Sequence, residues 1–344
     1  MLRKREIAAQ IFGTMGLGRA LGRLRSTVVS DLRVLAYHRV LTQLDEQTFA
    51  FDVELVSALQ AEFEWQMAYV AQHFQPISIH QLVEAIQHGQ ALPRRAVMVT
   101  FDDGYRDNCE VAFPVLQRLG VPAVFFLSTG YIGSEKLYWF DQVVHLLLRS
   151  KESSISLEAL GMSFKLPFAT KERRSLAMQL LKRLKQVSEP DRLLALKQLE
   201  VATNVVLDQT EVASSLPMTW AQVTEMARAG MEFGSHSVSH PILSEIANPN
   251  QLRQELEVSK AAIERAVGQS IHALAYPVGG PNAINEQVLT AVAQAGYSVA
   301  FTYQSGVNRM ETIKSLLLKR LHVERDTSRA MFEAALQWPD FFAR

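Results

Sequence analysis

The chain has 344 residues, 48% of them hydrophobic and 20% charged, so it can bury a large core. Lysine plus arginine and aspartate plus glutamate number 35 each, and this balance removes the net positive field typical of nucleic-acid-binding proteins. We therefore expect no nucleic-acid partner. The single cysteine, Cys109, excludes an intrachain disulfide and a cysteine-rich zinc site. Any metal site must use histidine and carboxylate ligands.

Residues 1–30 are interpreted as a basic amphipathic leader. A short apolar run from Ile7 to Leu17 is interrupted by Gly13 and Gly16 and has basic residues on both sides. The run is too short to span a bilayer, and no small-residue cleavage site follows it. The sequence therefore predicts neither a transmembrane helix nor a signal peptide. It favours a cytoplasmic or membrane-associated protein, with peripheral membrane contact through residues 1–25.

From residue 31 onward, short apolar runs alternate with helical patterns. The predicted strands are Arg33 to Tyr37, Pro76 to Ile79, Ala96 to Phe101, Ala123 to Ser128, Glu232 to Ser235, Ile271 to Tyr276, Ser298 to Thr302 and Leu316 to Val323. Strand followed by helix, repeated, indicates a parallel sheet, and about eight strands favour a barrel over a short open sheet. We therefore expect residues 31–344 to form an α/β barrel, with the active-site residues in the loops that follow the strands.

Some helices in this pattern have clear boundaries. Thr219 and Gln222 form a capping box for a helix that ends at Gly230, and the apolar stripe of residues 251–267 stops at Gly268. From about residue 133 to residue 216 the alternation is lost, and charge-laced helical stretches follow one another. We interpret this segment as a helical insertion in a loop after a strand.

Two adjacent carboxylates, Asp102 and Asp103, directly follow the predicted strand that ends at Phe101. Two carboxylates at the end of a buried strand are costly to desolvate, and they repel each other unless a cation or proton intervenes. An exposed Asp-Gly turn is the alternative for this segment taken alone. The first interpretation predicts a positive group at this position.

Two histidines, His236 and His240, follow another predicted strand with a spacing of four residues. On a helical turn this spacing brings both imidazoles to one side, as in metal sites, although a lone pair of this kind is more often structural. Both clusters lie past the carboxyl end of a strand, so in a parallel barrel they meet at one mouth. Two histidines, one aspartate and an open position form a catalytic metal arrangement, most naturally for Zn²⁺ and also for Co²⁺, Mn²⁺ or Fe²⁺.

These segments resemble the polysaccharide deacetylases that share the NodB homology domain, or carbohydrate esterase family 4, especially members linked to bacterial exopolysaccharide or capsule production. Thr100-Phe-Asp-Asp-Gly104 matches the first family motif, and His236-Ser-Val-Ser-His240 matches the second. The similarity covers roughly residues 31–325. It implies a distorted parallel (β/α) barrel and the metal-dependent removal of N-acetyl groups from N-acetylhexosamine units of a bacterial surface polysaccharide or its precursor.

The resemblance also implies a role for each motif residue. Asp102 would be the general base, and Asp103, His236 and His240 would hold one divalent metal. The residues alone require one aspartate to serve the metal but do not decide which. The oxyanion would be stabilised by the metal and by the backbone amide of Val278.

Two features depart from the family pattern. Ala275 stands where many members have an arginine that orients the catalytic aspartate. The late Leu-x-His motif is not matched, because Leu321 is followed directly by His322. His322 is therefore a candidate general acid, with a core or edge histidine as the alternative. Arg320 shares the predicted face of His322 on the strand.

Aromatic and turn residues near the predicted mouth are candidates for substrate contact. They are Tyr105, Trp139, Tyr276 and Pro277, with Tyr131 and Tyr138 close by in the sequence and His38 and Arg39 as minor candidates after the first strand. Aromatic rings there can stack on sugar faces, and core packing is the equal alternative.

Other functions remain open at this point. They are hydrolysis of a small non-carbohydrate amide, non-catalytic glycan binding, and oxygenase chemistry at a two-histidine, one-carboxylate iron site. Filled base and ligand positions count against a binding protein. Such iron sites usually place the carboxylate two residues from a histidine in an all-β fold, which is not the pattern here. We therefore expect an N-acetylated glycan as the partner.

Overall fold

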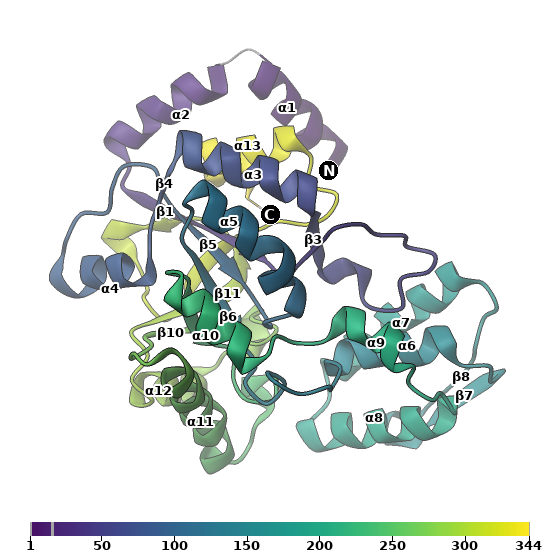
Figure 1. The fold of residues 1–344 in the computed structure, drawn as a ribbon. Helices are drawn as coiled ribbons and strands as arrows, with labels where there is room; N and C mark the ends of the chain where they lie inside the picture. The colour runs from purple at the N-terminus through teal and green to yellow at the C-terminus, as the bar shows by residue number, and fades with distance from the viewer. Residues whose placement is uncertain (1, 15–16, 344) are drawn as a thin grey trace.

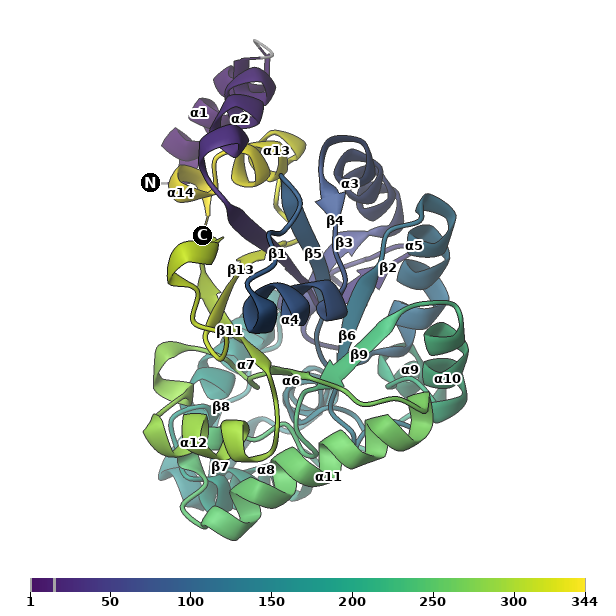
Figure 2. The same cartoon turned by 90° about the vertical axis from the view of Figure 1, so that its left-hand side faces the viewer.

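A computed structural model describes residues 2–14 and 17–343 of the chain. Its centre is a closed barrel of parallel strands in the order β1-β13-β11-β10-β9-β6-β5, with β5 pairing back to β1 (Figures 1 and 2). These strands are β1 (Asp31–Tyr37), β5 (Ala96–Phe101), β6 (Ala123–Leu127), β9 (Glu232–Ser235), β10 (Ala273–Ala275), β11 (Val299–Ser305) and β13 (Leu318–His322). The predicted parallel α/β barrel is confirmed.

The barrel closes with seven strands, so the expectation of about eight was wrong by one. In the predicted strand from Pro76 to Ile79, only β4 (Gln75–Pro76) pairs, with the first residues of β5. Ile79 already begins α4 (Ile79–His88), because Ser78 and Gln81 form a capping box at its start. A second short strand, β12 (Asn308–Arg309), pairs antiparallel with the start of β1.

Helices surround the barrel (Figures 1 and 2), and their buried apolar side chains belong to one core with the strands. They include α3 (Gln60–His73), α5 (Phe113–Leu119), α10 (Trp220–Arg228), α11 (Pro249–Val267), α12 (Glu286–Gln294) and α13 (Arg329–Gln337). The capping box of Thr219 and Gln222 is present at α10, and Gly268 ends α11 in the left-handed conformation, as predicted. A small parallel pair, β2 (Arg39–Leu41) and β3 (Val56–Leu59), adjoins the barrel.

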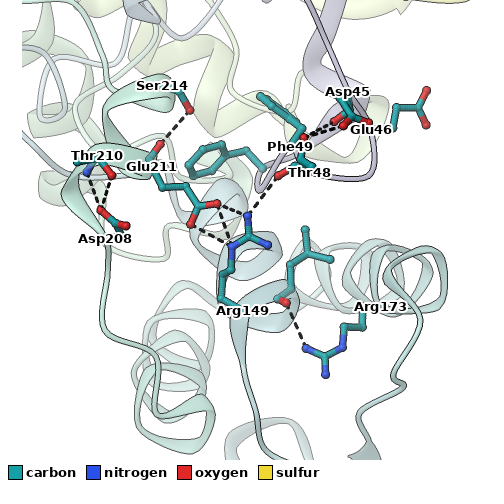
Figure 3. Close-up of polar contacts among 12 residues, drawn as sticks. Asp45, Glu46, Thr48, Phe49, Arg149, Arg173, Asp208, Thr210, Glu211 and Ser214 are labelled. Carbon is teal, nitrogen blue, oxygen red and sulfur yellow. Dashed lines mark hydrogen bonds and ion pairs between the residues drawn. The ribbon is translucent and has the colours of Figure 1, made fainter.

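The part of the chain between β6 and α10 forms a group of its own, at the lower right of Figure 1. It holds α6 (Trp139–Arg149), α7 (Thr170–Leu184), α8 (Glu189–Thr203) and α9 (Gln209–Val212), and an unforeseen hairpin of β7 (Ser154–Leu157) and β8 (Met162–Lys165). Leu147, Leu180 and Leu199 belong to its separate hydrophobic core. Arg149 pairs with Glu211 and donates to the carbonyl of Thr48, which ties the segment to the loop after β2 (Figure 3).

Residues 1–30, interpreted as a leader, contain two helices, α1 (Leu2–Thr14) and α2 (Leu17–Val28). Both lie beside α13 at the end of the barrel away from α6, α7 and α8 (Figures 1 and 2). Ala9 packs with Met331 and Ala334, and Arg25 pairs with Asp31. The short α14 (Pro339–Phe342) packs against α13. Among the described residues, no helix is long and apolar enough to cross a membrane.

Candidate active site

Asp103, His236 and His240 come together at the carboxyl ends of the strands. Asp103 follows β5 and the histidines follow β9, and only β6 separates these two strands. The Asp103 Oδ1 atom lies 3.6 Å from His236 Nε2 and 3.4 Å from His240 Nε2. One ligand atom from each residue lies within 4.8 Å of the other two, and all three side chains are buried. This group can hold a metal ion.

The hydrogen bonding of the three residues fits a cation. Within the described part of the chain, neither carboxylate oxygen of Asp103 has a hydrogen-bond partner, although both are buried. Burial and the charge of Asp102 raise the pKa of Asp103 well above its usual value, so an ionised Asp103 needs a positive partner. His236 Nδ1 donates to the carbonyl of Ala275 at 2.8 Å, which leaves Nε2 with its lone pair toward Asp103. Burial lowers the pKa of both histidines and favours the neutral, metal-binding form.

Unusual backbone conformations gather around this group. Six described residues other than glycine have a positive φ angle, and four of them lie here: Asp103 (71°), Ser237 (66°), His240 (55°) and Val278 (62°). Such conformations cost energy for side chains with a Cβ atom and persist only where the surroundings enforce them. Their gathering at one place supports a functional site, because strain of this kind is concentrated where geometry is used.

The loop that carries the two histidines is held by Glu255 of α11. The Glu255 carboxylate accepts hydrogen bonds from the backbone N–H groups of Val238 at 2.8 Å and Ser239 at 2.9 Å, and from the Ser239 hydroxyl at 2.7 Å. Glu255 is a positioning residue that sequence reasoning missed. No sequence pattern indicated this role for Glu255, because a glutamate on a surface helix is ordinarily solvated.

Asp102 is held by an arginine that comes from a different strand. Arg320 of β13 donates two hydrogen bonds of 2.7 Å, one to each carboxylate oxygen of Asp102, and its guanidinium is fully buried. Burial alone raises the pKa of Asp102, but the charge and hydrogen bonds of Arg320 outweigh it, and the net pKa is lowered. Arg320 therefore supplies the contact that Ala275 cannot make.

Two histidines near Asp102 differ in their access to the site. His38, directly after β1, has its Nε2 atom 4.0 Å from Asp102 Oδ2, and it lines the cavity over Asp103. His322, the candidate acid from the sequence, is not among the lining residues. Its ring stacks on Tyr303 at 3.7 Å between centroids, and its Nδ1 atom lies 3.4 Å from the Ser305 hydroxyl. Burial lowers the pKa of His38 to about 4 and that of His322 to about 3.

A cavity of about 400 Å³ opens over Asp103, His236 and His240. Asp102, Asp103, His236 and His240 form its floor, and Trp139 and Phe140 of α6 form one wall. Helix α7 contributes Met178, Leu181 and Lys182, and Lys185 follows its last residue. The segment before β3 contributes Asp52, Glu54 and Leu55. The helices α6 and α7 therefore cover the mouth of the barrel and shape the space above Asp103, His236 and His240.

The predicted substrate residues fall into two groups. Trp139, Tyr276 and Val278 line the cavity, and the Val278 amide makes no hydrogen bond among the described residues. Tyr105 and Pro277 are not among the lining residues. Tyr105 is fully buried and its hydroxyl donates to Asp141 at 2.9 Å.

Several residues near the mouth are held in internal contacts. Tyr138 donates to the backbone carbonyl of Asp103 at 2.6 Å. Arg39 pairs with Asp107 at 2.9 Å and lies over the ring of Tyr105. These contacts agree with internal packing, one of the two roles that aromatic residues near the mouth could have.

Comparison with known proteins decides the family. The sequence profile of the polysaccharide deacetylases matches residues 89–300, which include both the aspartate and the histidine motifs. The chain belongs to the polysaccharide deacetylase family. The resemblance drawn from Thr100–Gly104 and His236–His240 is thereby confirmed. In this deacetylase family member, the matched region contains β5, β6, β9 and β10. It therefore includes the strands that Asp103, His236 and His240 follow.

Relatives of this deacetylase family member include two poly-beta-1,6-N-acetyl-D-glucosamine N-deacetylases. That of Escherichia coli (strain K12) is 38% identical over 91 residues, which are 26% of this chain and 13% of the relative. That of Staphylococcus aureus (strain MSSA476) is 27% identical over 116 residues, which are 32% of this chain and 40% of the relative. The chain therefore matches less than half the length of either relative.

Solved structures of other proteins share the fold. The Streptococcus pyogenes deacetylase PplD, in complex with acetate, has a TM-score of 0.59 and 20% identity, and the match covers 90% of this chain and 98% of PplD. IcaB from Ammonifex degensii has a TM-score of 0.57 and 18% identity, with coverage of 90% and 97%. Nearly the whole chain therefore shares this barrel architecture.

Proposed function

We propose that this protein is a metal-dependent N-deacetylase that acts on N-acetylhexosamine units of a bacterial surface polysaccharide or its precursor. One observation carries the proposal: a buried Asp103, His236 and His240 group lies beside an aspartate, Asp102, that an arginine holds in one orientation. Family membership and the two poly-N-acetylglucosamine deacetylases among the relatives support the substrate class.

Asp103, His236 and His240 would hold the metal, with Zn²⁺ the ion best suited to two imidazoles and one carboxylate. A bound divalent ion would polarise the acetamide carbonyl and lower the pKa of a water molecule. Asp102 is the general base, because its lowered pKa keeps it ionised and Arg320 fixes the direction of its oxygens.

Two cavity residues are assigned to the remaining steps, which are protonation of the leaving nitrogen and stabilisation of the oxyanion. His38, 4.0 Å from Asp102, is placed to take up the proton that Asp102 accepts and to deliver it to the leaving nitrogen. We assign this role to His38 over His322, because His322 does not line the cavity. The backbone N–H of Val278 is the donor for the developing oxyanion.

Acetate release tests the proposed function. The zinc-loaded protein should release acetate from β-1,6-linked N-acetylglucosamine oligomers, and Asp102→Asn should lower kcat by about 10²- to 10⁴-fold. Asp326→Asn, a change at an exposed aspartate outside the cavity, serves as the matched control. Small N-acetyl amides in the same assay test the alternative amidohydrolase. Binding of the oligomers without acetate release from any substrate would indicate a glycan-binding protein instead.

The helices α1 and α2 are proposed to contact a membrane surface. Ile7 and Ile11 lie one turn apart on α1 and are 51% and 58% exposed, and Leu24 and Val28 of α2 are 65% and 81% exposed. The first 25 residues contain six arginine and lysine residues and one glutamate. Exposed aliphatic side chains on a basic segment suit an anionic lipid surface.

A further inference from the structure

The start of α6 touches two of the three metal-ligand candidates. Tyr138, the residue before the helix, donates a hydrogen bond to the backbone carbonyl of Asp103, and the ring of Phe140 lies against the ring of His240. We propose that Tyr138 and Phe140 are positioning residues, through which α6 fixes the geometry of the metal-binding group. This proposal rests on the proposed metal-dependent function, because it assigns supports to the ligands of that metal.

Tyr138 acts on the backbone of Asp103 where that backbone is strained. Asp103 has a φ angle of 71°, a conformation that persists in a residue other than glycine only where the surroundings enforce it. Its carbonyl accepts two hydrogen bonds, from the Tyr138 hydroxyl at 2.6 Å and from the Ser128 N–H at 3.2 Å. Neither carboxylate oxygen of Asp103 has a hydrogen-bond partner among the described residues. The direction of this carboxylate therefore depends on the backbone that Tyr138 holds.

The Tyr138 side chain is itself fixed in one direction. It is fully buried, and its ring stacks on Tyr131 at 4.3 Å and on Phe140 at 5.3 Å between centroids. Stacked aromatic rings restrain each other's orientation. The hydroxyl is therefore held toward Asp103 by contacts that do not involve Asp103.

A buried carboxylate anchors the start of α6. Asp141, in the first turn of the helix, accepts hydrogen bonds from the backbone N–H of Asp52 at 2.9 Å, the Tyr105 hydroxyl at 2.9 Å and the Ser215 hydroxyl at 2.6 Å. Asp52 and Ser215 lie far from Asp103 in the sequence. Because these bonds hold α6 without Asp103, we treat α6 as the fixed partner in the contact between Tyr138 and Asp103.

His240 depends on packing where His236 depends on a hydrogen bond. His236 Nδ1 bonds to the carbonyl of Ala275 at 2.8 Å, whereas His240 Nδ1 is buried without a hydrogen-bond partner among the described residues. Metal-binding histidines normally have their second ring nitrogen held by a partner, so the orientation of His240 needs another support. The Phe140 ring meets the His240 ring edge to face, at 5.3 Å between centroids and 69° between planes, and supplies this support.

Tyr138→Phe isolates the contribution of one hydroxyl. It retains the stacked ring, and the Asp103 carbonyl retains its bond from Ser128, so no buried acceptor is left unpaired. Tyr69→Phe is the matched control, because it also removes a buried tyrosine hydroxyl with a hydrogen-bond partner, the Gln337 side chain. Tyr69 lies on α3 and does not line the cavity.

Phe140→Leu tests the contact with His240 independently of Tyr138. Leucine keeps an apolar side chain in the wall of the cavity but removes the aromatic ring. Phe332→Leu, at a buried phenylalanine of α13, is its control. If one of the two α6 variants fails to fold, the other decides the proposal.

Competition with a chromophoric chelator would measure the Zn²⁺ affinity of the full chain without substrate. We expect Kd for Zn²⁺ to rise by about tenfold or more in Tyr138→Phe and in Phe140→Leu, and to stay close to the parent value in the two controls. With Co²⁺ in place of Zn²⁺, the visible absorption spectrum should change in the α6 variants alone, because it depends on the arrangement of the ligands. Parent affinity in both α6 variants, or equal losses in an α6 variant and its control, would overturn the proposal.

Acetate release, measured separately, distinguishes this proposal from the proposed function. Release by the parent chain together with parent Zn²⁺ affinity in the α6 variants would leave the function standing and reject the positioning role. Zn²⁺ binding that depends on Tyr138 and Phe140, without acetate release from any substrate, would uphold the positioning role and reject the deacetylase function. A parent chain that binds no Zn²⁺ would contradict both.

Discussion

Arg320 and Asp102 meet across the barrel through two parallel hydrogen bonds of 2.7 Å, although 218 positions separate them in the sequence. Arg320 lies on β13 and Asp102 follows β5, with β1 between these strands. The paired, buried geometry fixes the plane of the carboxylate and keeps it ionised. An oriented, ionised carboxylate is what a general base requires.

Replacement of Arg320 should slow catalysis with little change in KM. Arg320→Lys retains the charge but loses the bidentate hydrogen bonding to Asp102, so kcat should fall by about 10- to 100-fold. Arg320→Ala should lose more, and it should shift the acidic limb of kcat/KM to higher pH, because the pKa of buried Asp102 rises without the guanidinium. Steady-state kinetics across pH would measure both effects. Partial rescue of Arg320→Ala by added methylguanidine is expected, and an unchanged pH profile would contradict the positioning role.

The sequence predicted that Asp103, His236 and His240 lie together, but not which residues support them. Asp103, His236 and His240 were predictable because residues after parallel strands meet at one end of a barrel. The partner of Asp102 was not, because Ala275 stands where the family resemblance implies an arginine, and no local pattern indicates which strand provides one instead. Alternation on β13 placed Arg320 on one face with His322, but only the closed strand order brings Arg320 to Asp102.

The number of barrel strands and the details of the helical segment could also be predicted only in part. Pro76 to Ile79 was predicted as a strand from its apolar character, whereas the Ser78 capping box converts its end to a helix. The hairpin of β7 and β8 lies within a segment whose overall pattern is helical. Short apolar runs do not distinguish strands from helix starts, so such elements depend on tertiary contacts.

Glu255 should support metal binding without touching the metal. Glu255→Gln keeps the size of the side chain but weakens its contacts with the N–H groups of Val238 and Ser239. The affinity for Zn²⁺ should fall by about tenfold or more, as for other residues that orient metal ligands. Competition with a chromophoric chelator measures this affinity. Glu257→Gln, on the exposed side of the same helix, is the control, and equal affinities in the two variants would argue against the role of Glu255.

Metal should stabilise the folded chain through Asp103. At a Zn²⁺ concentration about 1,000 times Kd, binding adds about 4 kcal/mol to the free energy of unfolding, and a chelator removes it. Asp103→Asn should lose most of this increase, but without metal it should be at least as stable as the parent chain, because it removes a buried, unpaired carboxyl. Thermal unfolding with and without Zn²⁺ tests both statements. A similar rise in Tm for both proteins would exclude Asp103 as a ligand.

The exposed aliphatic residues of α1 should govern membrane contact. Ile7→Glu combined with Ile11→Glu should abolish sedimentation with phosphatidylglycerol vesicles, since it removes apolar burial and adds negative charge. Val201→Glu combined with Val206→Glu changes two residues of the helical segment that are 76% and 92% exposed, and it should bind as the parent chain does. Neutral phosphatidylcholine vesicles and high salt should weaken binding. Equal binding by both double variants would reject this contact surface.

Asp52 should make the stability of the protein decrease with rising pH. Burial, and then the charge of Asp141, raises the pKa of Asp52 from 3.8 to about 6, although Lys185 partly opposes this. The folded state therefore holds the Asp52 proton more tightly than the unfolded state, and this contribution to stability is lost as pH rises from about 4 through 6. The difference corresponds to about 3 kcal/mol.

Asp52→Asn tests this dependence, because an asparagine oxygen can still accept the hydrogen bond from the Glu54 amide. Relative to the parent chain, the variant should gain stability on the order of 2–3 kcal/mol above pH 7 and almost none below pH 4. Urea unfolding at several pH values measures the difference. A constant difference across this range would mean that Asp52 does not carry the shifted pKa, since only a group that titrates differently in the two states produces a pH-dependent gain.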